Sequence, residues 1–267
     1  MDLGLAGRTA LVTGSWRGTG AGIARVLADE GAAVLVHGFE AGSCAAVVEA
    51  IVASGGSAFE VVGDIRTDSG AEALKESVGR VVDHVDIVIN NYGVAEGSDW
   101  VSSDAESWHS SYNTNVVTGI RVTNVFLEGM RAKHWGRIVF LSTVGATRPG
   151  ERIPEYYAAK GALPSVAVSM SKYLANTGIT VNCVSPGIIA TAEMIELFTE
   201  RARRKGRSTE WPAVEQMVLE SGMTNPSGKI PSPDDVGRFV AFVVSESAWH
   251  LNGAHLRFDG GAADAVT

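Results

Sequence analysis

Cysteine is scarce in this chain, which limits the kinds of site that it can build. Only Cys44 and Cys183 occur among its 267 residues. Their spacing fits no pattern of metal ligands, and both lie in apolar or helical surroundings, so we expect buried free thiols rather than a disulfide or a metal site. Such thiols fit the reducing cytoplasm, where we expect the protein to work.

Basic charge and long apolar runs are lacking too. The 22 lysine and arginine residues are outnumbered by 30 aspartate and glutamate residues, which gives a net charge of −8. Because phosphate backbones attract basic surfaces, and because no basic arm or nucleic-acid motif occurs, we expect no nucleic-acid partner. No run of 18 apolar residues occurs, nor a charged leader before an apolar stretch, so we expect a soluble, unprocessed protein without a membrane segment.

What the chain does contain is a regular alternation of strand-like and helix-like segments, with no internal repeat or low-complexity linker. The expected strands lie at about 8–13, 32–37, 58–63, 85–90, 137–142, 179–184 and 255–258. The expected helices lie at about 19–30, 42–54, 69–83, 104–132, 155–175 and 234–246. Helical crossovers between strands predict an α/β fold, a single domain with a doubly wound, parallel, seven-stranded sheet and helices on both faces.

Ligands of such sheets bind beyond the carboxyl ends of the strands. Several polar residues and glycines fall at these ends, namely Gly14, Asp64, Asn91, Thr143 and Gly187. After the first strand, glycines spaced Gly-x-x-x-Gly-x-Gly let the backbone turn sharply and approach a pyrophosphate, whose charge would lie at the N-terminus of the next helix. The residues expected to contact a dinucleotide here are Gly14, Ser15, Arg17, Gly18, Thr19 and Gly20.

A second motif pairs a tyrosine with a lysine. Tyr156 stands four residues before Lys160, so both side chains share one face of a helix. The tyrosine pKa near 10 is too high for efficient proton transfer at neutral pH, and a nearby cation lowers it. Tyr157 cannot replace Tyr156, because its i+4 residue is Gly161.

Four further segments occur in the same order as the motifs of a known protein family. They are Asn90-Asn91-Tyr92-Gly93, Asn113-Thr114-Asn115, Val181-Asn182-Cys183-Val184-Ser185-Pro186-Gly187 and Leu256-Arg257-Phe258-Asp259-Gly260-Gly261. With the glycine loop and the Tyr156–Lys160 pair, they resemble the short-chain dehydrogenase/reductase family nearly end to end, and in particular its single-domain branch of 3-oxoacyl-carrier-protein reductases. Tyr92 departs from the family, which usually has a small residue there. The resemblance implies a Rossmann-like fold and hydride transfer with a nicotinamide cofactor.

The resemblance also implies roles for individual residues. Lys160 would hydrogen-bond the nicotinamide ribose, Asn115 would hold a water beside Lys160 at a break in its helix, and Asp64 would accept from the adenine amino group. Ile189 and Thr191 would meet the carboxamide and the phosphates. The other residues that we expect around the cofactor are His37, Gly38, Ile65, Asn91, Gly93, Tyr156, Pro186 and Gly187.

The hydroxyl that would align the substrate carbonyl has two candidates. The family usually has a serine 13 residues before the tyrosine, and this position is Thr143, whereas Ser142 lies one residue earlier. Adjacent side chains of a strand face opposite ways, so the two are not interchangeable unless the chain bulges. We favour Thr143 and keep Ser142 as the alternative.

The form of the cofactor depends on the end of the second strand. An NAD-specific site has a carboxylate there, and the segment Val34–Phe39 offers none. Arg17 resembles the basic residue that many NADPH-using relatives carry, and a guanidinium suits a phosphate dianion. NADP(H) is therefore preferred, while Glu40, two residues past the expected position, keeps NAD(H) open.

The segment at about 190–233 is longer than the family leads us to expect, and in relatives it covers the substrate. It contains the basic run 200–207, which is either a solvated helix face or a cationic lid for an anionic substrate. A further expectation concerns Pro164, which leaves the Lys160 carbonyl without its helical donor, so that the helix bends and a water or hydroxyl replaces this donor.

The activity expected from these residues is hydride transfer between NADP(H) and a small carbonyl or alcohol substrate, with Tyr156 as general acid/base. A catalytically silent dinucleotide-binding regulatory or scaffolding protein is the alternative. A sugar-nucleotide epimerase or dehydratase is disfavoured, because the chain lacks the added C-terminal substrate domain. By resemblance we expect a homotetramer, with a dimer next, packed through the 104–132 and 155–175 helices. The apolar face of the latter is expected to consist of Ala159, Leu163, Val166 and Met170.

Overall fold

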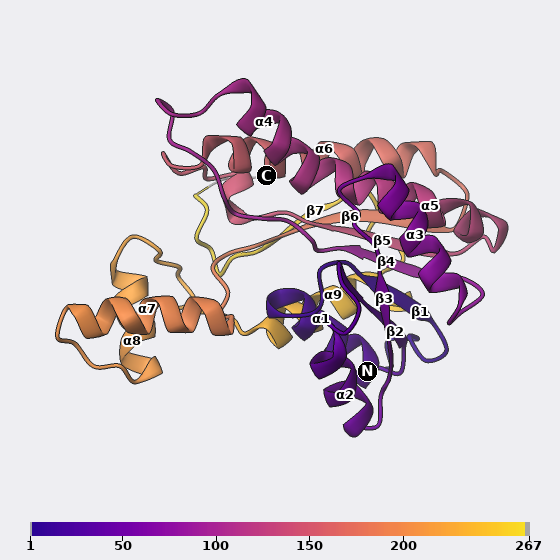
Figure 1. Cartoon of the computed structure of the whole chain (residues 1–267), viewed down its shortest axis with the longest axis horizontal. Coiled ribbons are helices and arrows are strands. Elements are labelled where there is room, and N and C mark those ends of the chain that lie inside the picture. Colours follow the sequence, from indigo (N-terminus) through magenta and orange to yellow (C-terminus); the bar gives the residue numbers. More distant parts are fainter. Residues whose placement is uncertain (1, 265–267) are drawn as a thin grey trace.

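The computed structural model describes residues 2–264 and places seven parallel strands in one sheet (Figure 1). The strands are β1 (Thr9–Val12), β2 (Ala33–Gly38), β3 (Ser57–Val62), β4 (Ile87–Asn90), β5 (Gly136–Leu141), β6 (Ile179–Pro186) and β7 (His255–Phe258). Their order is β3-β2-β1-β4-β5-β6-β7, and every neighbouring pair is parallel. Strands β1 to β3 are added toward one edge of the sheet and strands β4 to β7 toward the other. In folds of this kind, the point where the strand order switches, here between β1 and β4, leaves a crevice at the carboxyl ends of the strands.

Helices cover both faces of this sheet. They are α1 (Gly18–Asp29), α2 (Ala45–Ala53), α3 (Asp68–Gly79), α4 (Ala105–Tyr112), α5 (Thr118–Ala132), α6 (Pro154–Tyr173), α7 (Ala192–Arg204), α8 (Trp211–Glu220) and α9 (Pro233–Val244). One core packs α1, α2 and α9 against the sheet, and a second core packs α3, α5 and α6 against the other face. Along β1, Ala10 and Val12 face the first core while Leu11 faces the second, as the alternation of a strand requires. The predicted Rossmann-like, doubly wound fold is therefore confirmed.

The predicted 104–132 helix is divided by one unusual turn. Between α4 and α5 the chain forms a π-helical segment, Asn113–Val117. The side-chain amide of Asn115 donates to the Ser111 carbonyl (3.1 Å), which places a polar side chain inside the turn. Such π turns occur often at functional sites. The break that the resemblance implied at Asn115 is thus a local widening of a continuous helix.

Helix α6 contains Pro164, and its consequence follows the prediction in part. The Lys160 carbonyl, which lacks a donor at Pro164, accepts a hydrogen bond of 2.8 Å from the Ser142 hydroxyl. The hydroxyl of the residue that directly follows β5 therefore supplies the missing donor. Since both groups are buried, this bond ties the end of β5 to the middle of α6.

The apolar face of α6 that we predicted for subunit packing lies mainly against the sheet of its own chain. Ala159 and Leu163 are buried in the core beneath α6, and Val166 and Met170 pack against the same core. Ala159 and Leu163 are therefore taken up by the core, whereas Val166 and Met170 are half-buried and keep part of their surface exposed. The exposed apolar residues of α6 are Val168 and Tyr173.

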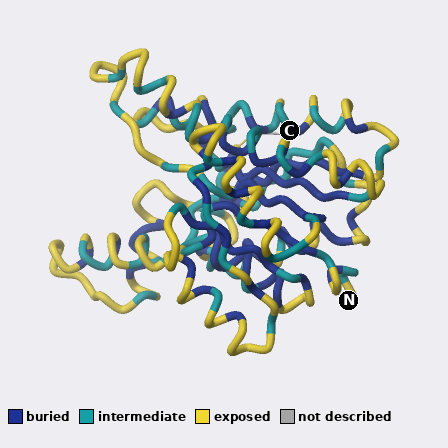
Figure 2. Tube along the Cα trace, turned by 45° about the vertical axis from the view of Figure 1, so that its right-hand side comes forward, coloured by how far each residue is buried: buried dark blue, intermediate teal, exposed yellow. Residues whose placement is uncertain are grey.

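Helices α7 and α8 project beside the sheet as a separate excursion (Figure 1), and their outer surfaces are exposed (Figure 2). The sequence analysis assigned no helices within 190–233. A small core of its own holds the excursion together, formed by Phe198, Ala202, Val214, Met217, Val218, Leu219 and Ile230. The basic run begins in the exposed last turn of α7, where cationic side chains complement the helix dipole. This placement favours the solvated helix face over a cationic lid.

The described residues also lack two features that would indicate other kinds of site. Among residues 2–264, no helix is both long and apolar enough to span a membrane. Within the same range, no group of three or more His, Cys, Asp or Glu side chains could hold a metal ion. Cys44 and Cys183 are both buried free thiols, as predicted.

Candidate active site

The glycine loop joins β1 to α1 at the crevice. Gly14 and Gly18 adopt left-handed conformations, with φ of 63° and 56°. A Cβ on Gly20 would lie 2.6 Å from both the Asn91 amide nitrogen and the Gly14 carbonyl oxygen, so only glycine fits this close approach. The Asn91 amide donates to the carbonyls of Thr13 (2.9 Å) and Gly14 (3.2 Å). Asn91 thus shapes the loop from β4, and the first turn of α1 faces the open side.

Two of the predicted cofactor contacts turn inward. Ser15 is fully buried, and its hydroxyl donates to the Val12 carbonyl (2.7 Å) while accepting from the His37 backbone (3.0 Å). The His37 ring is fully buried and bonded to Gly14 and Gly63. These side chains therefore support the glycine loop from below, because their polar atoms already have partners within the protein. At the end of a buried strand, sequence alone does not distinguish an inward from an outward polar side chain.

Asp64, the predicted adenine acceptor, is bound by a residue that the sequence analysis missed. Arg66 donates to both carboxylate oxygens, Nε to Oδ1 and Nη2 to Oδ2, each at 2.8 Å. The hydrogen bond from Arg66 lowers the pKa of Asp64. The Arg66 guanidinium also lies 5.0 Å from the centre of the Phe39 ring. Ile65, by contrast, is fully buried in the core below.

Three aromatic rings gather above the glycine loop. Trp16 lies 5.4 Å from Phe39, and Phe39 meets Tyr92 edge to face at 4.9 Å between ring centres. Tyr92 also packs on Gly14, where an added Cβ would lie 3.1 Å from the Tyr92 ring. The departure from the family's small residue at Tyr92 therefore has a structural consequence, because this ring completes the aromatic cluster with Trp16 and Phe39.

Arg17 lies on the open side of the loop. It is 66% exposed and faces Glu193 of α7, with Nη1 and Oε1 3.6 Å apart. On the neighbouring residue, a Cβ on Gly18 would lie 3.8 Å from the methyl group of Thr191. The Thr191 hydroxyl accepts from the Met194 amide and caps α7. The first turn of the excursion therefore borders the glycine loop.

The predicted catalytic residues meet at the carboxyl ends of β4 and β5. Tyr156 and Lys160 both lie on α6, as the i+4 spacing requires. The Thr143 side chain lies close enough to the Tyr156 phenol to lower its pKa, and the Thr143 hydroxyl also accepts from the Gly145 amide (3.3 Å). Ser142 points the other way and donates to the Lys160 carbonyl, so Thr143 is the hydroxyl that faces the tyrosine.

The two titratable groups of this site respond mainly to burial. Burial raises the pKa of Tyr156 to about 12, the Thr143 hydrogen bond opposes this shift, and Tyr157 adds to it. Burial lowers the pKa of Lys160 to about 8. The Lys160 ammonium donates to the Leu141 carbonyl (2.8 Å) and is not among the groups that shift the Tyr156 pKa. The predicted lowering of the phenol pKa by Lys160 is therefore not seen here.

Asn115 reaches the same centre from the π-helical turn. It is buried, and it both accepts from the Val94 amide (2.9 Å) and donates to the Val94 carbonyl (3.2 Å). A Cβ on Gly93 would lie 2.6 Å from the Lys160 ammonium and 2.7 Å from the Asn115 carbonyl oxygen. Lys160 and Asn115 therefore approach one glycine from two elements, and a larger residue would displace them.

The last predicted segment follows β6. Pro186 ends this strand, and the Gly187 amide donates to the Phe258 carbonyl of β7 (3.0 Å). Ile189 packs against the core that α1, α2 and α9 cover. From Gly187 the chain runs past the glycine loop into α7, so this segment closes one side of the crevice.

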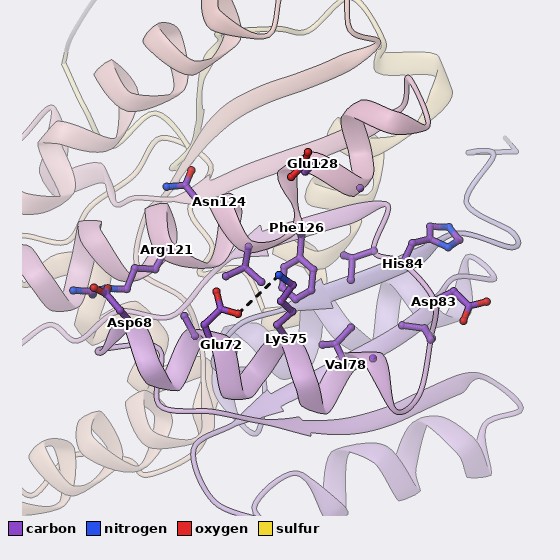
Figure 3. Close-up of a pocket in the computed structure, with 16 residues that line it drawn as sticks. Asp68, Glu72, Lys75, Val78, Asp83, His84, Arg121, Asn124, Phe126 and Glu128 are labelled. Carbon is purple, nitrogen blue, oxygen red and sulfur yellow. Dashed lines mark hydrogen bonds and ion pairs between the residues drawn. The ribbon is translucent and has the colours of Figure 1, made fainter.

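A groove of about 630 Å³ lies elsewhere, between α3 and α5 (Figure 3). Its rim is charged, with Lys75 beside Glu72 and Arg121 paired with Asp68. None of the residues predicted from the sequence lines it, and it lies along the flank of the helices rather than at the carboxyl edge. We therefore assign the active site to the crevice and not to this groove.

Comparison with known proteins identifies the family of this chain. A model described as short chain dehydrogenase matches residues 8–202. The chain belongs to the short-chain dehydrogenase family. D-beta-hydroxybutyrate dehydrogenase of Cupriavidus necator is 32% identical to it over 261 residues, which cover 96% of this chain and 98% of that one.

Solved structures of similar proteins agree with the fold. L-sorbose reductase from Gluconobacter frateurii, complexed with NADPH and L-sorbose, has a TM-score of 0.92 at 28% identity and full coverage of both chains. A 3-oxoacyl (acyl-carrier-protein) reductase from Agrobacterium tumefaciens C58 with NADP bound has a TM-score of 0.85 at 29% identity, covering 97% and 96%. The chain is thus an oxidoreductase of this family, and its relatives give no support to the catalytically silent alternative.

Proposed function

We propose that this short-chain dehydrogenase interconverts a small carbonyl compound and its alcohol with NADP(H). The observation that carries the proposal is the convergence of Tyr156 and Lys160, one turn apart on α6, with Asn115, whose carbonyl oxygen approaches Gly93 together with the Lys160 ammonium. The Thr143 side chain faces the phenol from the end of β5. When bound, the nicotinamide cofactor supplies or accepts the hydride. The protein's own side chains then have to orient the carbonyl and exchange one proton with its oxygen.

The crevice fits a dinucleotide. The left-handed conformations of Gly14 and Gly18 let the loop turn sharply before α1, so that a pyrophosphate would lie at the N-terminus of this helix. We assign this cradle to Gly14, Gly18, Thr19 and Gly20. Asn91, Gly93, Pro186, Gly187, Ile189 and Thr191 would border the rest of the cofactor.

Within this site, we assign the proton transfer to Tyr156. The phenol is protonated at neutral pH, as a donor in the direction of carbonyl reduction must be. Its pKa of about 12 makes it a weak acid, so a cation or a bound cofactor near the phenol has to lower this pKa for efficient proton transfer. Thr143 would hydrogen-bond the same substrate oxygen, because it already contacts the phenol. Lys160 and Asn115 would connect the phenol to the ribose and to solvent through the space beside Gly93.

The preference for NADP(H) rests on Arg17 and Gly38. Arg17 is exposed at the loop, where its guanidinium can exchange Glu193 for a 2′-phosphate. At Gly38, where an NAD-type carboxylate would stand, a Cβ would overlap the Ser43 hydroxyl. The Cys44 sulfur would lie 2.9 Å from the same Cβ. Gly38→Asp, which should move the preference toward NADH, therefore requires both Ser43 and Cys44 to shift.

The cellular setting is part of the same proposal. Two buried free thiols suit the cytoplasm. For assembly, we propose a homotetramer in which the outer surface of α6, with Val168 and Tyr173, contacts a second subunit. Light scattering at micromolar concentration tests this assembly, and a monomeric mass would contradict it.

The proposed activity is tested by following NADPH at 340 nm over ketones, 3-oxoacyl thioesters, quinones, sugars and steroids. Turnover of at least one carbonyl class is expected, with NADPH preferred over NADH. Tight NADPH binding without turnover of any carbonyl or alcohol would contradict an enzyme and favour the regulatory alternative. The screen also identifies the substrate class, which the site residues leave open.

A further inference from the structure

The first glycine of the loop is held from two sides. On one side the Asn91 amide of β4 binds the Gly14 carbonyl oxygen. On the other side the Gly14 amide donates to Nδ1 of His37, at 3.1 Å. Because Gly14 adopts a left-handed conformation, its two peptide planes depend on these partners for their orientation.

The His37 ring spans from this loop to the end of β3. Its Nε2 lies 2.9 Å from the Gly63 carbonyl oxygen, directly before Asp64 and Ile65. Since Nδ1 accepts from Gly14, the proton must be on Nε2, which donates to Gly63. The ring is fully buried, and burial lowers the pKa of His37 to about 4, so it stays neutral with this one tautomer.

The backbone of His37 is fixed as well. Its amide donates to the Ser15 hydroxyl (3.0 Å), and its carbonyl accepts from the Ser15 amide (3.1 Å). One residue of β2 is thus bonded to two residues of the glycine loop and to the last residue before Asp64. The glycine loop would hold the pyrophosphate and the β3 end would hold the adenosine, so His37 connects the two halves of one ligand site.

We propose that His37 is a positioning residue of the cofactor site, which fixes the glycine loop relative to the end of β3 without contacting the cofactor itself. This inference rests on the proposed NADP(H) function. It goes beyond packing, because an apolar ring substitute would fill the same space but leave the Gly14 amide and the Gly63 carbonyl unpaired. Loss of these two bonds therefore weakens cofactor binding more than it weakens turnover.

The test compares His37→Leu with His37→Gln. Leucine fills the site without polar atoms, whereas glutamine keeps one acceptor and one donor on a planar group. For His37→Leu we expect an NADPH Kd about tenfold higher, the size of one lost hydrogen bond, with kcat at saturating NADPH within about twofold of wild type. His37→Gln should recover most of the affinity. The matched control is His255→Gln, at the Ser185–His255 contact between β6 and β7, which should leave Kd unchanged.

The outcomes separate this inference from the proposed function. Kd is measured directly by the quenching of tryptophan fluorescence, independently of turnover. If wild-type protein binds no NADPH, the proposed function fails and the inference with it. If wild type binds and His37→Leu binds equally well, or if kcat falls while Kd is unchanged, only the inference is overturned.

A second measurement covers the case in which His37→Leu does not fold. In ¹⁵N-labelled wild-type protein, long-range ¹H–¹⁵N spectra report the tautomer of each histidine ring. His37 is expected to remain the neutral Nε2–H form from pH 8 down to pH 5. A neutral Nδ1–H form, or a cationic ring within this range, would overturn the proposed bonding.

Discussion

Ser142 and Thr143 are neighbours in the chain, yet their side chains point in opposite directions at the carboxyl edge of the sheet. One points toward the crevice and the other toward the interior of the protein. Thr143 faces the crevice and contacts the Tyr156 phenol, while Ser142 faces the interior and binds the Lys160 carbonyl. Other site residues at this carboxyl edge also fall into two groups, an open side that faces the crevice and a buried side behind it. Tyr156 and Arg17 lie on the open side, whereas Lys160 and His37 are buried behind them.

This difference teaches how the site is built. On the buried side, the polar side chains are bonded to backbone groups of other elements, so they position the open side and contribute to stability. On the open side, the polar groups keep contacts that a ligand can replace, such as the exposed Arg17–Glu193 pair. We therefore expect open-side substitutions to change turnover or binding directly. Buried-side substitutions should change stability and, at His37, also the affinity for the cofactor through the glycine loop.

The largest effect is expected on the open side, at Tyr156. Tyr156→Phe should lower turnover by about 10²–10⁴-fold, because general acid catalysis contributes this much, while NADPH binding and the melting temperature stay near wild type. Tyr157→Phe is the matched control and should retain turnover within a few fold. Activity of Tyr156→Phe within tenfold of wild type would remove the phenol from this role.

Arg17 tests the open side at the cofactor. Arg17→Ala should weaken NADPH by about 1.5–3 kcal/mol, the range of a hydrogen bond to a charged group, and leave NADH nearly unchanged. Arg25→Ala on α1, which breaks a surface pair with Asp234, is the control and should affect neither cofactor. Calorimetric titration with both cofactors provides the measurement. Equal losses for NADPH and NADH would refute the 2′-phosphate assignment.

Lys160 tests the buried side through pH. Its pKa in the folded protein is about 8, below its ordinary 10.5, so the folded state binds fewer protons than the unfolded state between these values. Stability should therefore rise with pH from 8 to 10.5, by about 1–3 kcal/mol, and fall again as pH returns to 8. Urea unfolding of Lys160→Met should lose this rise, whereas Lys75→Met, at an exposed lysine, should keep it. A wild-type curve parallel to Lys160→Met would contradict the burial of the ammonium.

The smallest effect concerns Ser142 and Pro164 together. Ser142→Ala should cost about 1–2 kcal/mol of unfolding free energy, because it leaves the buried Lys160 carbonyl without a donor. In a Pro164→Ala background the helix regains the amide at 164, so the same change should cost less. A double-mutant cycle measures the difference. Purely additive costs would show that the hydroxyl does not replace the helical donor.

Much of the fold followed from the sequence, for a physical reason. The inner strands are buried on both faces and read as continuous apolar runs. The edge strands β3 and β7 are less buried, yet all seven strands were located to within about two residues. The helices of the excursion, α7 and α8, could not be predicted from the sequence. They bury only a small core of their own, and their exposed faces are mixed in charge.

The site could be predicted only in part. Motif spacing brought Thr143, Tyr156, Lys160 and Asn115 to one place, but spacing says nothing about which way a polar side chain turns. Ser15 and His37 point inward, and Ser142 binds a carbonyl that only the fold brings near. Arg66 was missed because its pairing with Asp64 depends on the conformation of the turn after β3. Its signal in the sequence was an opposite charge two residues away.

Hydride transfer itself is the central claim, and isotope labelling tests it most directly. NADPH deuterated at C4 of the nicotinamide is incubated with the wild-type protein and a carbonyl compound identified by the 340 nm screen. Mass spectrometry and NMR of the product should show one deuterium on the former carbonyl carbon from one of the two C4-labelled forms, and Tyr156→Phe should form this product far more slowly. An alcohol product that carries no deuterium from either labelled form would contradict direct hydride transfer.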